Sequence, residues 1–214
     1  MKNILVAVAA VLLCLSAAAQ KKEEVLFSDP YQIDSSDYFL VPRMIDDLNA
    51  AAYGKGKGYL PWGNYSDIVF YNSETNQSKK LFGDKLALIN TFSQRRNYYY
   101  YDESREKEIP ANILRHHIIY LVRTENFNND GGLDTDDPVY LYISTKTGDN
   151  LRQITPGGFH VLSWTVSKDQ KMILVKGQND KNGNKKFGQG DDQLYYRIDL
   201  EDDVSKIRCY PLNF

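Results

Sequence analysis

The chain has 214 residues, a length that predicts a single domain, and carries 26 Lys and Arg against 28 Asp and Glu. A balance this close to neutral, with no basic stripe, argues against nucleic acid and anionic membrane surfaces as partners. The unusual figure is the 16 tyrosines. Tyr favours strands and interfaces, because its ring buries apolar area while its hydroxyl stays hydrated.

The first nineteen residues are typical of a secretory signal peptide. Lys2 gives a short basic start, and the apolar run 4–16 is shorter than the ~20 residues that a membrane span needs. The following Ala17–Ala19 fits the small-residue rule for cleavage, which makes Gln20 the new N-terminus. We therefore predict a soluble, periplasmic or extracellular protein, not membrane-spanning, with a single domain over 20–214. An uncleaved N-terminal anchor is the alternative.

The two cysteines bear on how the protein is exported. A lipoprotein signal has a small residue before its modified cysteine, whereas Leu13 precedes Cys14, which argues against lipidation. After cleavage only Cys209 remains, so no intrachain disulfide can form. A single cysteine near the C-terminus is more often a small buried apolar residue than a nucleophile.

Strand-forming segments dominate the rest of the chain. Runs rich in Val, Ile, Tyr and Phe, bounded by turn residues, predict strands at 38–41, 68–72, 79–82, 85–92, 118–123, 139–144, 151–155, 160–166, 172–176, 194–200 and 206–210. Their short connections predict antiparallel meander pairing. The best helix candidate is 43–52, short at best because the Gly/Lys loop 53–58 follows it.

A second loop is predicted at 95–110, and it contains four consecutive tyrosines, Tyr98–Tyr101. By the period-2 rule of strands, we interpret these tyrosines as an edge strand with two rings facing in and two facing out. An exposed stacking platform is the alternative.

A repeated hairpin organises the sequence. Segments 68–82, 139–155 and 194–210 each place an aromatic strand before a polar turn and a second strand with a basic residue. The last two copies extend upstream through 119–123 and 172–176, about 54 residues apart, each leading into a loop of Asn, Asp and Gly. Repeats of this kind bury their faces against neighbouring copies, as the blades of a propeller do.

The stretch from the second repeat into the third carries a more specific pattern. Asp149–Pro156, then Trp164, then Ser167–Leu174 resembles the TolB-like blade of the WD40-like propellers, in which a strand ending in "rqlT" precedes "w-s-p-D-G-k" and an apolar strand. The departures are Gln170 where that family usually has Gly, and Val166 without the usual Pro after it.

The resemblance covers 118–210 well and 38–82 loosely. The chain is also similar to a group of exported Bacteroidetes proteins whose blades carry Asp/Asn/Gly loops. These resemblances imply an all-β fold of antiparallel four-stranded meander repeats, arranged as a propeller of three to four blades. Segment 25–41 is the candidate for completing the fourth blade, and an open or partial propeller is the alternative. The two resemblances imply a fold and an exported location, and they imply no activity.

Residues 126–137 match a 12-residue calcium loop. Oxygen-bearing side chains fall at positions 1, 3, 5, 9 and 12, and a backbone carbonyl completes the set at position 7: Asn126, Asn128, Asp130, Asp134, Asp137 and Gly132. Gly131 falls at position 6, where the turn is sharpest. The departures are Asn at position 1, Asp rather than Glu at position 12, and flanking strands instead of helices. We predict a structural Ca²⁺ here; a polar loop that serves turn geometry alone is the alternative.

The loop 180–191 repeats the pattern less completely. Asp180, Asn182, Asn184 and Asp191 match positions 1, 3, 5 and 12. Position 6 is Lys185, however, and three lysines in the loop oppose a bound cation. We therefore expect the metal in the first loop rather than in the second.

No catalytic constellation is recognisable. His116 and His117 are adjacent on a predicted strand and would point to opposite faces, and no G-x-S-x-G motif is present. Trp62 and Trp164 are expected to pack in the core, although 61–65 is a candidate aromatic patch for a sugar or peptide.

We therefore expect a non-enzymatic exported binding module with a protein or glycan partner in the cell envelope. A periplasmic hydrolase acting on glycans or peptides is the alternative. It would need two carboxylates that face each other, one of them with a raised pKa.

Overall fold

The structure, a computed structural model, describes residues 25–33, 36–45, 65–90 and 114–213. In this part of the chain every regular element is a strand except the short 3₁₀ helix η2 (Val204–Lys206). None of the described helical segments is long and apolar enough to cross a membrane. Several predictions fall outside the described residues: the signal peptide 1–19, the loops 53–58 and 95–110, the four tyrosines, Trp62 and most of the patch 61–65.

Twelve strands follow one another along the described chain. They are β1 (Tyr31–Gln32), β2 (Tyr38–Met44), β3 (Tyr65–Asn72), β4 (Gln77–Lys80), β5 (Leu88–Ile89), β6 (His117–Arg123), β7 (Tyr140–Thr145), β8 (Arg152–Gln153), β9 (Phe159–Val166), β10 (Met172–Asn179), β11 (Asp192–Asp199) and β12 (Arg208–Leu212). The prediction of an all-β, antiparallel fold is confirmed. The predicted helix start at Arg43 is wrong, because β2 continues through Met44 in register with β3.

The strands form three consecutive meanders of four, β1–β4, β5–β8 and β9–β12, in which each strand is antiparallel to the next. One pairing, Tyr65 with Ile89, joins the first two meanders into an eight-stranded sheet, and the third is a separate four-stranded sheet. Segment 25–41, expected to complete a fourth blade, instead supplies β1 and the start of β2 of the first meander.

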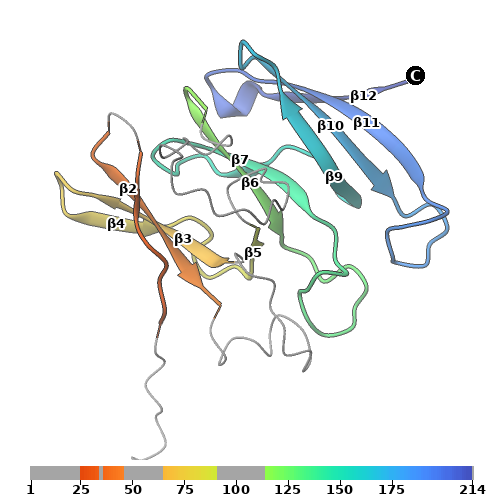
Figure 1. Cartoon of the computed structure of the whole chain (residues 1–214), viewed down its shortest axis with the longest axis horizontal. Coiled ribbons are helices and arrows are strands. Elements are labelled where there is room, and N and C mark those ends of the chain that lie inside the picture. Colours follow the sequence, from red (N-terminus) through yellow and green to blue (C-terminus); the bar gives the residue numbers. More distant parts are fainter. Residues whose placement is uncertain (1–24, 34–35, 46–64, 91–113, 214) are drawn as a thin grey trace, which may run out of the picture.

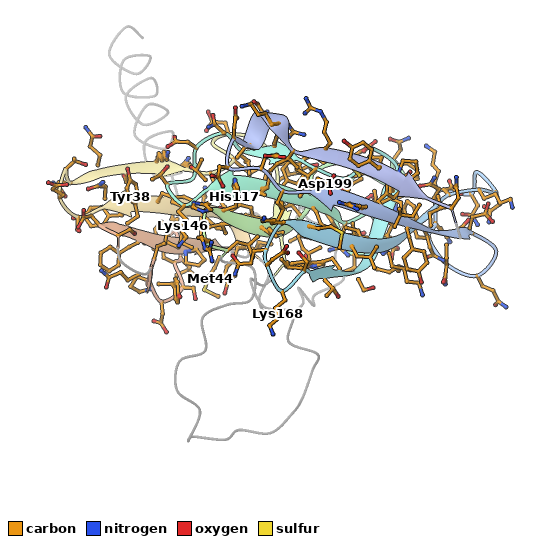
Figure 2. The ribbon with its side chains drawn as sticks, turned by 90° about the horizontal axis from the view of Figure 1, so that it is seen from above. Tyr38, Met44, His117, Lys146, Lys168 and Asp199 are labelled. Carbon is orange, nitrogen blue, oxygen red and sulfur yellow. The ribbon has the colours of Figure 1, made fainter. Side chains whose placement is uncertain are left out.

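The meanders lie side by side in chain order (Figure 1). Figure 2, viewed from above, shows one labelled residue of each in succession along the long axis: Tyr38 on β2, His117 on β6 and Asp199 on β11. The three repeated hairpins of the sequence occupy the same place in each meander, as β3–β4, β7–β8 and β11–β12.

The middle meander is buried on both faces, which explains the nearly continuous apolar sequence of β6. Ile119 packs toward the third meander, in a cluster with Val175 and Ile198. Its neighbour Ile118 packs toward the first meander, in a cluster with Phe70. Successive strand residues point to opposite faces, so alternate residues of β6 serve the two interfaces. Trp164, predicted as a core residue, lies in the first of these clusters and is 7% exposed.

Candidate metal-binding loop

The loop 126–137 connects β6 to β7, and Asp137 closes it from the inside. This side chain is fully buried. Its Oδ1 accepts the amide of Phe127 at 2.8 Å, and its Oδ2 accepts the amide of Asp134 at 2.9 Å. Position 12 of the loop thereby holds positions 2 and 9 together. Burial raises the pKa of the Asp137 carboxyl, and the amide hydrogen bonds oppose that shift.

Arg123, the last residue of β6, hydrogen-bonds to the end of the loop from its buried side. Its Nε donates to the carbonyl oxygen of Asp137 at 3.0 Å, and its Nη1 donates to Oδ1 of Asn90 at 2.9 Å. Burial lowers the pKa of Arg123 to about 10, while the nearby carboxylates of the loop favour its charged form. The sequence pattern did not single out Arg123, because a strand residue that reaches back under the loop carries no local signal.

Short-range hydrogen bonds shape the rim of the loop. Oδ1 of Asn128 accepts the amide of Asp130 at 2.9 Å, and Oδ1 of Asp130 accepts the amide of Gly132 at 3.2 Å. The same turn recurs at Asp134, which accepts the amide of Asp136 at 2.8 Å. Asn and Asp side chains form such turns readily with the backbone two residues on.

Asn126, at position 1, holds an oxygen without a partner. Its Oδ1 is buried and accepts no hydrogen bond. A buried acceptor left unsatisfied costs roughly 1–3 kcal/mol, so this oxygen is available to a cation. Among the described residues, no group of three or more His, Cys, Asp or Glu side chains could hold a metal ion. A site in this loop would therefore depend on amide and backbone oxygens as well as on carboxylates.

The loop 180–191, between β10 and β11, has the same internal network. Oδ1 of Asp191 accepts the amide of Lys181 at 3.2 Å, and its Oδ2 accepts the amide of Gly188 at 2.9 Å. Positions 2 and 9 are again held by position 12. Position 1 differs, because Asp180 accepts the amides of Asn184 and Lys185 at 3.1 and 2.8 Å.

The two loops touch across the boundary between the second and third meanders. The rings of Phe127 and Phe187 lie 5.3 Å apart, and Phe187 stacks on His160 at 5.0 Å. Nδ1 of His160 accepts the amide of Val139 at 3.2 Å. Burial lowers the pKa of His160 to about 4, so its ring is neutral at physiological pH.

The two adjacent histidines and the cysteine considered in the sequence analysis lie away from the loop 126–137. His116 and His117 both contact Asp202: Nε2 of His117 lies 3.3 Å from its carbonyl oxygen, and Nε2 of His116 lies 3.8 Å from its Oδ1. The strand rule does not separate them, because β6 begins only at His117. Both line a cavity of about 640 Å³. Cys209 is half-buried against the core, and burial raises its pKa to about 11.

Comparison with protein-family models, with curated proteins and with solved structures found no match for this chain. The TolB-like resemblance thus depends on the blade pattern itself. One departure from that pattern has a counterpart in the fold: Gln170, where TolB-like blades usually have Gly, has a φ of 58°. This is the left-handed region that Gly favours.

Proposed function

We propose that this protein is a non-enzymatic exported binding module, built as an open, propeller-like stack of three blades with a structural Ca²⁺ in the loop 126–137. The hairpins support a common blade geometry. Lys79, Arg152 and Arg208 are each paired with the residue nine positions earlier: Phe70, Ile143 and Asp199. Register therefore makes these three basic residues equivalent.

The first two basic residues reach forward to the hairpin of the next meander. Lys79 pairs with Asp149 in the β7–β8 turn. Arg152 donates to the carbonyl oxygens of Val204 and Ile207, before β12, at 3.0 and 3.2 Å. Both meander interfaces thus use the same kind of contact, as expected when each blade packs on the next in the same way.

The outer face of the third meander supports an open stack rather than a closed ring. At the position of Phe70 and Ile143, which are buried in the two interfaces, the third meander has Asp199. Asp199 pairs with Arg197 at 2.6 Å. Arg208 turns back to the carbonyl oxygens of its own connection. A charged outer face is typical of a terminal repeat that ends an array.

The observation that carries the calcium proposal is the partnerless, buried Oδ1 of Asn126 within a loop that has the calcium-loop spacing. Asn126, Asn128, Asp130, Asp134 and the carbonyl of Gly132 would supply oxygen ligands, which Ca²⁺ prefers. Asp137 accepts one amide on each oxygen and keeps further lone pairs for the ion.

Thermal unfolding of the purified protein in calcium at up to about 0.1 M and in chelator tests this proposal. With amide ligands at position 1 and Asp at position 12, we expect a dissociation constant on the order of 10⁻⁴ to 10⁻³ M. At 100 times that constant, calcium should add about 2.7 kcal/mol to the free energy of unfolding. Unfolding that is the same in calcium and in chelator would rule out the calcium site.

A surface patch on the first meander supports a binding role. Val25, Leu26, Phe27 and Met44 are 38, 45, 50 and 41% exposed. Leu26 and Phe27 run along the edge of β2, where the amide of Met44 donates to the carbonyl oxygen of Leu26 and Phe27 pairs with Arg43. We call the four exposed residues the β2 edge patch. Exposed apolar residues that gather at a strand edge are typical of interaction sites, and we assign this one to a protein partner.

The β2 edge patch can be tested by capture of partners from the cell envelope fraction. Leu26→Ser should abolish recovery of a partner that the unmodified protein captures. Leu162→Ser is the matched control, because Leu162 is also 45% exposed but lies on the third meander. Equal recovery with both variants would exclude the patch as the binding surface.

The placement of the perturbed carboxylates favours a binding module over the hydrolase alternative. Burial raises the pKa of Asp67 as well as that of Asp137. Asp67 accepts the amides of Ile68 and Phe82 at 2.7 and 3.0 Å, so both carboxylates hold backbone turns in place. Neither lines the cavity beside His117.

A further inference from the structure

A lysine of the second polar loop lies against the first. Lys185 has a φ of 60° at position 6 of the loop 180–191. When the Asn129 amide is oriented to satisfy both of its neighbours, its oxygen accepts from Nζ of Lys185 at 2.6 Å. Its nitrogen then donates to the carbonyl oxygen of Asn126 at 3.3 Å. One side chain thus links the ammonium of Lys185 to the first residue of the candidate calcium loop.

We propose that Lys185 is a tethered cation that competes with calcium at the loop 126–137, so that the third meander sets the calcium affinity of the second. This inference rests on the proposed calcium site. Asp130, Asp134, Asp136 and Asp137 place four carboxylates in one short loop. Without a divalent ion the ammonium offsets part of their repulsion, whereas with the ion bound the two cations repel each other.

The contact is held in place by packing on either side. Phe187, two residues after Lys185, lies between Phe127 of the first loop and the ring of His160. These ring contacts hold the two loops in a fixed relative position. The ammonium of Lys185 is therefore kept beside Asn129. A tethered charge of this kind acts at a high effective concentration and needs no free ion.

The same loop provides the control. Lys186 follows Lys185 directly, and its amide donates to Oδ1 of Asn184 at 2.8 Å. Among the described residues, its ammonium has no ion-pair partner. Lys181 is less suitable, because it pairs with Asp192 at 2.9 Å. Replacing Lys186 removes the same charge from the same loop without touching the link to Asn129.

Calcium titration by calorimetry would compare the unmodified protein with Lys185→Met and Lys186→Met. Lys185→Met should bind calcium about three- to tenfold more tightly, since one nearby positive charge is removed, and Lys186→Met should differ less than twofold. The difference should shrink at about 1 M salt, where the screening length falls to about 3 Å.

A second measurement follows Lys185 in the unmodified protein. Calcium should raise the reactivity of Lys185 toward an amine-labelling reagent, read by mass spectrometry, and leave that of Lys186 unchanged. No calcium binding by the unmodified protein would overturn the proposed site and this inference together. Calcium binding with unchanged or weaker affinity in Lys185→Met, or with no change in Lys185 labelling, would overturn the inference alone.

Discussion

The loops 126–137 and 180–191 have the same backbone hydrogen-bond network in different surroundings. In both, the position-12 aspartate accepts the amides of positions 2 and 9. Asp137 is fully buried above Arg123, whereas Asp191 is only half-buried. The comparison shows that the conformation of such a loop and the environment of its carboxylates have different origins. Side chains within the loop shape its turns, whereas the packing of other segments against it sets the burial and the charged neighbours of the position-12 aspartate.

The largest expected difference concerns the closing aspartates. Asp137→Ala should lower the free energy of unfolding by about 3 kcal/mol, because it leaves two partly buried amides without acceptors and opens a space at a buried position beside Arg123. Asp191→Ala should cost about 1 kcal/mol, since water can replace its carboxylate. Urea unfolding in chelator measures both without a contribution from metal. Equal losses would show that burial does not distinguish the two loops.

The second-largest expected difference between the two loops is in their contribution to stabilisation by calcium. Asp130→Ala should remove most of the ~2.7 kcal/mol that saturating calcium adds, because position 5 loses a carboxylate ligand. Asp180→Ala should leave that gain nearly unchanged, although it lowers stability in chelator, since Asp180 holds two backbone amides. The readout is the shift of thermal unfolding between calcium and chelator. An equal loss of the shift in both variants would contradict the assignment of the ion to the loop 126–137.

The smallest expected effects are at position 6, where both loops have a positive φ: 98° at Gly131 and 60° at Lys185. Gly131→Ala should cost about 1–2 kcal/mol, because a side chain disfavours the left-handed region. Lys185→Gly relieves the same backbone strain but removes the ammonium that contacts Asn129, so its net change in stability in chelator should stay below about 1 kcal/mol. Urea unfolding measures both, and a stabilised Gly131→Ala would contradict the backbone argument.

Strand positions were largely predictable from the sequence. The aromatic and β-branched runs located ten of the twelve strands within a few residues. β1 has only two residues and no alternation to detect, and β5 shrank to Leu88–Ile89 within the longer apolar run 85–92. The predicted helix at 43–52 failed at its start because pairing with β3 carries β2 through Met44. Tertiary pairing overrode a weak local preference there.

The candidate site was predictable only in part. Gly131 and the Asx turns of Asn128 and Asp130 follow from local spacing, and the structure contains them. Arg123 and Asn90 escaped prediction, because they meet the loop only after β5 and β6 pair. Contacts between residues so far apart in sequence leave no periodic signal.

The sequence by itself determined the strands, the repeated hairpins and the short turns of Asn and Asp within each polar loop, because these features depend on residues only a few positions apart. The tertiary structure decided which aspartate is buried, that Arg152 reaches the third meander, and that Asp199 pairs with Arg197 at the register position where the other meanders have buried apolar residues. It also decided that Lys185 meets Asn129. The physical reason is that these contacts join residues from different meanders. They form only when the three meanders pack against one another.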